Sequence, residues 1–225
     1  MTDASYPVRP ETTPTRHRER VSYDRAAVHA VLDEALLCHV GFVMDGLPVV
    51  LPQLHARVGE RLYLHGSSGA RALRAAGDAG DGGIPICVTV TLVDGLVLAR
   101  SAFNHSINSR SVVVHGVARR VTDEAEKRSA LTCLVDAVVP GRSDHVRGPS
   151  GRELAATTVL ALELENVSLK VRSGDPMDEE EDLTLPFWAG VLPLTAGAAP
   201  PETAANVAEG IDVPEHVRRW ARPAR

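Results

Sequence analysis

The chain has 225 residues, of which 44% are hydrophobic, and a formal net charge of −5, which suits one large domain, or one domain with tails, and gives no sign of nucleic-acid binding. No apolar run approaches the ~18 residues of a membrane-spanning helix, and the polar, Arg-rich N-terminus has no apolar signal-peptide segment. We therefore expect a soluble, cytoplasmic protein with neither a nucleic-acid nor a membrane partner. The three cysteines contain no C-x-x-C pair, which excludes a zinc ribbon or a redox motif.

The N-terminal part of the chain divides into an arm and a helix. Residues 1–21 contain three prolines and several charges, and we expect them to form a flexible arm. Apolar residues then recur at helical spacing from Val28 to Ala35, which predicts an amphipathic helix over Asp24–Leu36.

A β-hairpin is predicted next. The segments His39–Met44 and Leu47–Leu51 read as strands, and they flank Asp45-Gly46, a dipeptide that type I′ hairpin turns favour. Pro52 lacks a backbone N–H, so we expect it to end the pairing or to mark a bulge.

The stretch from Glu60 to Arg74 is the most informative part of the chain. A strand over Arg61–His65 runs into the hydroxyl-rich turn Gly66-Ser67-Ser68-Gly69, and Ala70–Ala76 reads as the start of a helix. That order points free backbone N–H groups and two hydroxyls at one spot, and Arg71 can add a charged fork. A phosphate site is therefore predicted, with an ordinary left-handed turn and helix cap as the competing interpretation.

Two further strand regions follow. Pro85–Val93 is β-branched and is joined by Asp94-Gly95 to Leu96–Ala102, which predicts a second Asp-Gly hairpin. Arg110–Val121 reads as a long strand, in which Gly116 suggests a bend.

The next elements are a helix and a strand. Thr122 or Asp123 can cap a helix, in which Asp123 and Glu126 have capping-box spacing. The apolar face of this helix is formed by Leu131, Leu134, Val135 and Val138. Thr158–Val171 alternates between apolar and polar residues and is predicted to be one last long strand.

The C-terminal region has no clear strand pattern. The acidic run Asp175–Asp182 is typical of a solvated linker. Leu185–Leu194 is apolar but broken by prolines, so we expect neither helix nor strand there, only packing against another part. Residues 195–225 are predicted to form a tail, helical near Pro214–Trp220 and otherwise mobile.

Six or seven strands with tight hairpins and only three helices do not read as βαβ units. They favour a mainly β fold, an antiparallel barrel decorated by helices.

Several motifs, taken in order, give the chain a family resemblance. After the histidine and Gly/Ser turn come H-S-x-N-x-R-S-V-V-V-x-G from His105, the strand end Lys170-Val171-Arg172, and W-A-G-V-L-P-L from Trp188. Over residues 22–194 this combination resembles the pyridoxamine 5′-phosphate oxidase-related flavoproteins, within them the nitroimidazole-reductase-like branch. The resemblance implies a six-stranded antiparallel split β-barrel that works as a homodimer, with FMN in the clefts between subunits.

The resemblance also implies the residues of a cofactor site. His65 would stand beside the flavin as the catalytic residue. The cofactor-binding positions would be Leu51, Pro52 and Gln53 along the ring, Ser67, Ser68 and Arg71 at the phosphate, Asn108, Arg110 and Ser111 at the ring or ribityl chain, and Trp188 closing the cleft.

This chain departs from the family pattern at two places. Ser109 stands where relatives commonly carry Tyr, and the stretch around Arg71 lacks a frequent Lys, so retention or choice of the flavin is in question. The tail also lacks the basic motif of the true pyridoxamine 5′-phosphate oxidases, so vitamin B6 oxidation is not expected.

We therefore expect an FMN-dependent oxidoreductase that passes electrons from a nicotinamide to a small organic acceptor, a nitroaromatic or a quinone. The alternative is a split-barrel protein that holds a flavin, a deazaflavin or a haem without turnover, with His65 or His105 as a possible axial ligand. The histidine spacings match no zinc signature, so no metal-ion site is expected. P-loop, Rossmann and nucleophile-elbow motifs do not occur in the sequence.

Overall fold

The computed structural model describes residues 4–68 and 82–220. These residues group into two compact units. The first comprises Met1–Ala35, Val88–His115 and Glu165–Thr195, and the second comprises Leu36–Cys87, Gly116–Leu164 and Ala196–Arg225. The two longest strands, β5 (Ile84–Leu98) and β6 (Ser106–Arg120), pass from one unit into the other.

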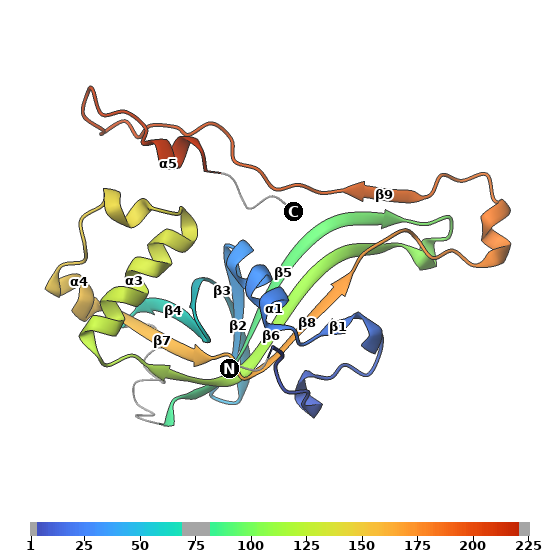
Figure 1. The fold of residues 1–225 in the computed structure, drawn as a ribbon, viewed down its shortest axis with the longest axis horizontal. Helices are drawn as coiled ribbons and strands as arrows, with labels where there is room; N and C mark the ends of the chain where they lie inside the picture. The colour runs from blue at the N-terminus through green and yellow to red at the C-terminus, as the bar shows by residue number, and fades with distance from the viewer. Residues whose placement is uncertain (1–3, 69–81, 221–225) are drawn as a thin grey trace. The chain divides into compact units, whose positions relative to one another are not determined.

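The second unit is built on a ring of strands. Besides parts of β5 and β6 it contains β2 (Leu37–Met44), β3 (Leu47–Val58), β4 (Arg61–Ser67) and β7 (Thr157–Glu163). Hydrogen-bonded neighbours follow the order β6-β7-β4-β3-β2-β5, and β5 also pairs with β6, so six strands close a ring (Figure 1). The pairs β2–β3, β3–β4, β4–β7 and β6–β7 are antiparallel. The predicted six-stranded antiparallel barrel is confirmed.

Helices complete the second unit. They are α3 (Glu124–Val138), the short helix η5 (Arg142–His145), α4 (Gly151–Ala156) and α5 (Glu215–Arg218). As predicted, Asp123 caps α3 by accepting a hydrogen bond from the Glu126 N–H. The Glu126 carboxylate accepts instead from the Tyr63 hydroxyl at 2.8 Å, which ties α3 to β4. The small core beneath it contains Tyr63, Val121, Ala130 and Val159.

The first unit places a small sheet against one helix. It contains η1 (Pro10–Thr12), η2 (Arg18–Arg20), β1 (Val21–Ser22), α1 (Arg25–Glu34), η4 (Ala102–Asn104), β8 (Asn166–Arg172), η6 (Glu180–Thr184) and β9 (Gly190–Pro193). Within it β8 pairs with both β1 and β6, and β9 pairs with β5. The predicted helix α1 is confirmed, with Asp24 as its N-cap and Val28, Val31 and Leu32 buried.

The Asp45-Gly46 hairpin is confirmed. Both residues have positive φ, 50° and 76°, as a type I′ turn requires. Pro52 does not end the pairing, because β3 continues and Pro52 lies opposite His39 in the β2–β3 register. On its other side, β3 pairs with β4 only from His55 onward, so Pro52 has no strand partner there in the described chain. The N–H that proline lacks is therefore not needed for pairing on that side.

The turn conformation at Gly46 carries the first testable prediction. Replacing Gly46 with Ala puts a Cβ on a residue at φ 76°, so we expect a loss of about 1 kcal/mol of unfolding free energy in urea denaturation. Gly197→Ala is the matched control, since Gly197 has no positive φ and nothing lies within 4 Å of an added Cβ. Equal stability of the two variants would contradict the turn assignment.

The second Asp-Gly hairpin was predicted wrongly. Asp94 and Gly95 lie inside the continuous strand β5, and neither has a positive φ. Gly95 serves a different purpose, because it pairs with Pro193 and an added Cβ would stand 3.1 Å from the Leu192 carbonyl oxygen. The glycine permits close approach of β9 and makes no turn.

The single long strand predicted over Thr158–Val171 was also wrong. A bend at Leu164-Glu165 divides it into β7, which pairs with β4 in the second unit, and β8, which pairs with β6 in the first. Alternation continues through the bend because each half faces a core of its own. Strand β6 changes partner in the same way across Gly116, pairing with β8 up to His115 and with β7 from Arg119.

Parts of the arm, of the acidic run and of the C-terminal region make specific contacts. In the arm, Tyr6 is buried, donates or accepts a hydrogen bond with His29 at 2.9 Å, and lies under the Arg25 guanidinium. In the acidic run, the Asp178 carboxylate is 1% exposed and accepts from the Arg100 guanidinium at 2.8 Å. Part of Leu185–Leu194 forms β9, contrary to expectation, whereas the predicted C-terminal helix is confirmed as α5.

The three cysteines are free thiols. Cys38 is buried, and burial raises the pKa of its thiol to about 12. This residue is a small protonated hydrophobe, as expected.

Candidate functional site

A cavity of about 620 Å³ lies in the second unit. Most of its wall is apolar and comes from the helix α3 and the turn after it. The lining residues are Leu54, His65, Leu131, Thr132, Leu134, Val135, Val138, Val139, Arg142, Ser143, Val146, Arg147, Gly148, Pro149, Glu153 and Thr157. This volume is within the roughly 300–1,000 Å³ of small-molecule and cofactor pockets.

His65 is the histidine of this cavity, and it is the residue that the sequence singled out. Strand β4 presents it opposite Val159 of β7, and the Gln53 amide donates to its backbone carbonyl. Its ring is half-buried, and the Nδ1 atom is buried without a hydrogen-bond partner among the described residues. Burial lowers the pKa of His65 below its ordinary value, so the ring is neutral at pH 7. A neutral imidazole with an unused nitrogen can bind a metal or a ligand.

Two arginines, Arg142 and Arg147, contribute positive charge to a cavity wall that is otherwise mostly apolar. Arg147 forms a bidentate ion pair with Glu153, at 2.6 and 2.7 Å. This pair holds the loop that contains Arg147 against α4. Arg142 makes no side-chain hydrogen bond or ion pair within residues 4–68 and 82–220, so its guanidinium is available to an anionic group. The cavity thus combines an imidazole, apolar walls and a free cation.

Local sequence signals build this wall. Ser150 and Glu153 form a capping box that starts α4. Asp136 of α3 accepts from the Ser143 N–H and hydroxyl at 2.8 and 2.7 Å, which fixes η5 against the end of α3. Arg142 and Ser143 are therefore held at the cavity by a helix-to-turn contact.

The predicted phosphate corner differs from expectation in its backbone. Gly66 and Ser67 belong to β4, where they pair with Thr158 and Thr157, and the Ser68 N–H donates to the Ala156 carbonyl at 2.9 Å. Fewer N–H groups are therefore free than the predicted turn required. Ser67 is exposed at the end of the strand. Arg71 and the predicted helix Ala70–Ala76 lie outside the described residues.

The residues predicted to contact the flavin ring lie on β3, before its pairing with β4 begins. Leu51 is 47% exposed and Pro52 is exposed beside it. Gln53 connects this edge to the cavity, because its amide donates to the His65 carbonyl. The structure thus joins Gln53 and His65, two of the predicted cofactor positions.

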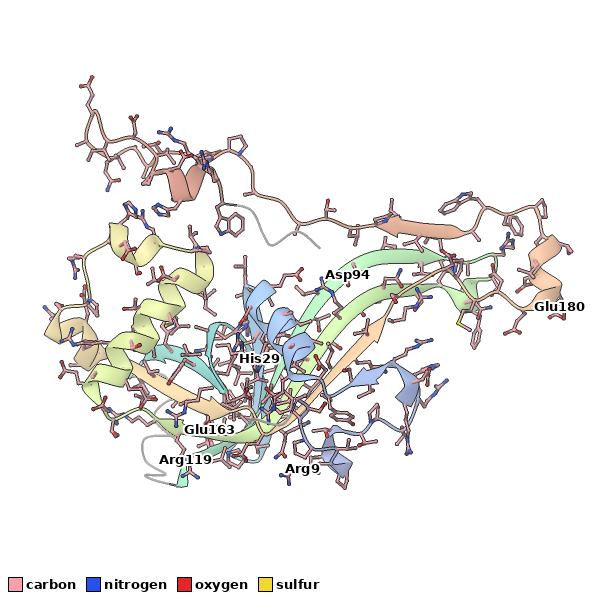
Figure 2. All side chains as sticks on the ribbon, in the orientation of Figure 1. Arg9, His29, Asp94, Arg119, Glu163 and Glu180 are labelled. Carbon is pink, nitrogen blue, oxygen red and sulfur yellow. The ribbon has the colours of Figure 1, made fainter. Side chains whose placement is uncertain are left out.

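The remaining predicted positions belong to the first unit. Asn108 is buried, donates to the Gly174 carbonyl at 3.1 Å and accepts from the Arg172 guanidinium, so its amide already has partners. Arg110 is held between Glu34 and Asp94, the latter labelled on β5 in Figure 2, at 2.6 to 3.0 Å. The hydrogen bonds that it donates to Glu34, then to Asp94, raise the pKa of its guanidinium.

Ser111 and Trp188 are accessible in the first unit. Ser111 lines a second cavity of about 290 Å³ together with Ser168 and Lys170, its neighbours on β8. Trp188 is 69% exposed and its ring lies over Gly190. Contact of these residues with a cofactor stays a prediction.

Sequence reasoning missed most of the cavity wall. It assigned Leu131, Leu134, Val135 and Val138 to a helix face, and the structure turns that face partly toward the cavity. Arg142 and Arg147 had no signal of their own beyond their position in a Gly/Pro-rich loop. Of the described residues, no group of three or more His, Cys, Asp or Glu could hold a metal ion, and no helix is long and apolar enough to cross a membrane.

Comparison with known proteins identifies similar chains. The family model for pyridoxamine 5′-phosphate oxidase matches residues 24–171. The flavocytochrome Anf3 from Azotobacter vinelandii is 40% identical, with a TM-score of 0.86 over 93% of this chain and 95% of that chain. An FAD and haem binding protein from Mycobacterium smegmatis is also 40% identical, with a TM-score of 0.82 over 88% and 96%.

A more distant structure shares the fold. A protein assigned to 5-nitroimidazole antibiotic resistance in Bacteroides thetaiotaomicron is 22% identical, with a TM-score of 0.54 over 67% of this chain and 86% of that chain. No curated protein matches this chain.

Proposed function

Because this chain belongs to the pyridoxamine 5′-phosphate oxidase family, we propose that it is a redox protein that binds a flavin and a haem. Two solved structures that are 40% identical over most of their length support the pair of cofactors, since one is a flavocytochrome and the other binds FAD and haem. The observation in this chain that carries the proposal is His65, a half-buried imidazole whose buried Nδ1 is unused, in the wall of an apolar cavity.

The cavity residues fit a haem. Its volume of about 620 Å³ and its leucine and valine walls suit a flat apolar ring system. A ring nitrogen of His65 would ligate the iron of the haem. The unpaired Arg142 would meet a propionate carboxylate through a charge-assisted hydrogen bond, whereas Arg147 already has Glu153 as its partner. A bound haem would supply one-electron chemistry.

The flavin is proposed to lie along β3. Leu51 and Pro52 are exposed on opposite faces of β3, and each offers an apolar contact for the ring. Gln53 can donate to a ring acceptor in place of the His65 carbonyl. Ser67 at the end of β4, with Ser68 and Arg71, would hold the phosphate. Both FMN and FAD carry this phosphoester, and the 40%-identical FAD and haem binding protein favours FAD where the sequence predicted FMN.

The finer catalytic expectation belongs to the same proposal. A nicotinamide would reduce the flavin, and electrons would leave through the haem or pass directly to a small nitroaromatic or quinone acceptor. His65 would then position the electron-accepting group in the first case and stand beside the flavin in the second. Free cysteines and the predicted cytoplasmic location suit this chemistry in a reducing compartment.

A homodimer is proposed through the β2–β3 hairpin. One face of this hairpin carries Leu37, Val43, Pro48, Val50 and Pro52, whereas Cys38 and Val40 on the other face are buried. We call it the hairpin face. Its valines are 71% and 63% exposed, although an apolar face of this kind is normally covered. A second copy would cover it and place Leu51 and Pro52 near the subunit boundary.

The dimer prediction can be tested with one charge. Val50→Asp should convert the protein from dimer to monomer in gel filtration with light scattering, because an unpaired carboxylate cannot be buried in an apolar interface. Val8→Asp, at a residue that is 67% exposed in the arm, should remain dimeric. A Val50→Asp protein that is still a dimer would place the interface elsewhere.

The absorbance spectrum of the protein as isolated tests the function. We expect flavin bands together with a Soret band, and the haem bands should change on reduction. Flavin bands without a Soret band, before and after incubation with haemin, would favour the FMN oxidoreductase over the flavocytochrome. A protein that takes up neither haemin nor a flavin would contradict both.

A further inference from the structure

The C-terminal helix α5 is attached to the second unit by two aromatic contacts. The imidazoles of His216 in α5 and His145 in η5 are stacked, with centroids 4.3 Å apart and planes inclined by 22°. The Trp220 indole N–H donates to the Val138 carbonyl at 2.9 Å. The chain before α5 contributes little, since residues 196–212 are exposed throughout. In the described part of the chain, this ring stack and this hydrogen bond are the polar and aromatic interactions that hold α5 in place, which is typical of a segment that opens locally.

These contacts are made to the wall of the His65 cavity. Val138 lines the cavity, and η5 contributes Arg142 and Ser143 to it. The same short turn that His216 packs against thus carries the free guanidinium. Docking of α5 supports this turn from outside. Without α5 the turn would keep the Asp136–Ser143 hydrogen bonds and the hydrogen bond from the Arg142 N–H to the Val139 carbonyl.

The docked position of His216 disfavours a positive charge on its ring. Both ring nitrogens are buried without a hydrogen-bond partner in the described parts of the chain. Burial, then the neighbouring His145 and Arg142, lower the pKa of His216, and Asp136 and Asp144 oppose this. On its own helix, Glu215 is paired with Arg219 and exposed. A proton on His216 is therefore accommodated better when α5 is free in water.

We propose that α5 is a pH-sensitive clamp on the wall of the His65 cavity, docked while His216 is neutral and released when it is protonated. The clamp itself stands on the His145–His216 stack and the Trp220 contact. Only the identity of the ligand that it retains rests on the proposed function. Release of α5 would free the turn with Arg142 and speed the escape of a ligand from the cavity.

The direction of the pH effect follows from the lowered pKa. The docked form binds fewer protons than the released form, whose His216 titrates near its ordinary value of 6.5. Docking is therefore strongest above pH 6.5. Its free energy becomes less favourable as the pH falls from 6.5 to the lower pKa of the docked ring, and it changes little below that pKa.

Tryptophan fluorescence tests the clamp without any cofactor. Trp188 and Trp220 are the two tryptophans of the chain, so Trp188→Phe leaves Trp220 as the single reporter. In the cofactor-free protein its emission should shift to the red, as the indole enters water, when the pH is lowered from 7.5 to 5. His216→Phe in the same background keeps an aromatic ring on His145 but cannot be protonated, and it should abolish the shift. His17→Asn removes an exposed histidine and should leave the shift intact.

Two outcomes would overturn the clamp: constant Trp220 emission over this range, or a shift that survives His216→Phe in a protein with native far-UV circular dichroism. Haemin release gives a second readout. For each protein, the rate of haemin release at pH 5.5 is divided by the rate at pH 7.5. This ratio should be several-fold larger for the Trp188→Phe protein than for the protein that also carries His216→Phe. If haemin does not bind at all, the fluorescence result still decides the clamp, so failure of the two proposals can be told apart.

Discussion

Replacement of His65 by Ala is expected to abolish the Soret band of the haem-loaded protein. The imidazole is the histidine in the wall of the 620 Å³ cavity, and the apolar side chains around it cannot ligate iron. Removing a group that only orients a metal ligand costs up to about 100-fold in metal affinity. Because His65 would be the ligand itself, haemin affinity should fall by more than about 100-fold. The fold should survive, because the Gln53 amide donates to the backbone carbonyl of residue 65.

Two comparisons make this result specific. His105→Ala removes the rival histidine, whose ring Nδ1 is 2.9 Å from the Ser101 carbonyl oxygen, and should leave the Soret band unchanged. Added imidazole should restore a Soret band to the His65→Ala protein by occupying the space that the side chain left. Loss of haem in His105→Ala with retention in His65→Ala would move the axial ligand out of the cavity.

Replacement of Arg110 by Met is expected to cause the largest loss of stability. Its guanidinium bridges Glu34 of α1 and Asp94 of β5 inside the first unit, and the three side chains are 14–23% exposed. Without the cation two carboxylates face each other with little water between them. We expect a loss of about 3 kcal/mol and a fall in the melting temperature of roughly 6–12 °C for a chain of this size.

Arg128→Met is the matched control, because Arg128 pairs with Glu124 on the exposed surface of α3. That variant should change stability by less than about 0.5 kcal/mol. Adding Glu34→Gln and Asp94→Asn to Arg110→Met should recover part of the loss, since neutral partners tolerate the missing cation. An Arg110→Met protein that keeps its melting temperature but loses flavin affinity would assign Arg110 to the cofactor, as the family resemblance predicted.

Local signals predicted those parts of the fold that local geometry decides. Asp45-Gly46 made the predicted turn because both residues adopt positive φ, and Asp24 and Asp123 capped the helices that they precede. The same dipeptide at Asp94-Gly95 made no turn. Pairing with β9, a segment distant in sequence, decides the conformation there, and a dipeptide contains no information about it.

The candidate site divides along the same line. His65 could be singled out from the sequence through the family resemblance, and the structure places it at a cavity. The cavity wall could not be predicted, because the apolar residues of α3 recur at the same helical spacing whether they pack in a core or line a pocket. Arg142 acquires its place only from the contact of Ser143 with Asp136, and His216 from a stack with a residue of another element.

A crystal structure of the protein grown with haemin and FAD tests the central claim most directly. We predict iron within bonding distance of a ring nitrogen of His65, with a propionate on the Arg142 guanidinium. Haem bound elsewhere on the chain, or a His65 cavity that stays free of it at saturating haemin, would contradict this account.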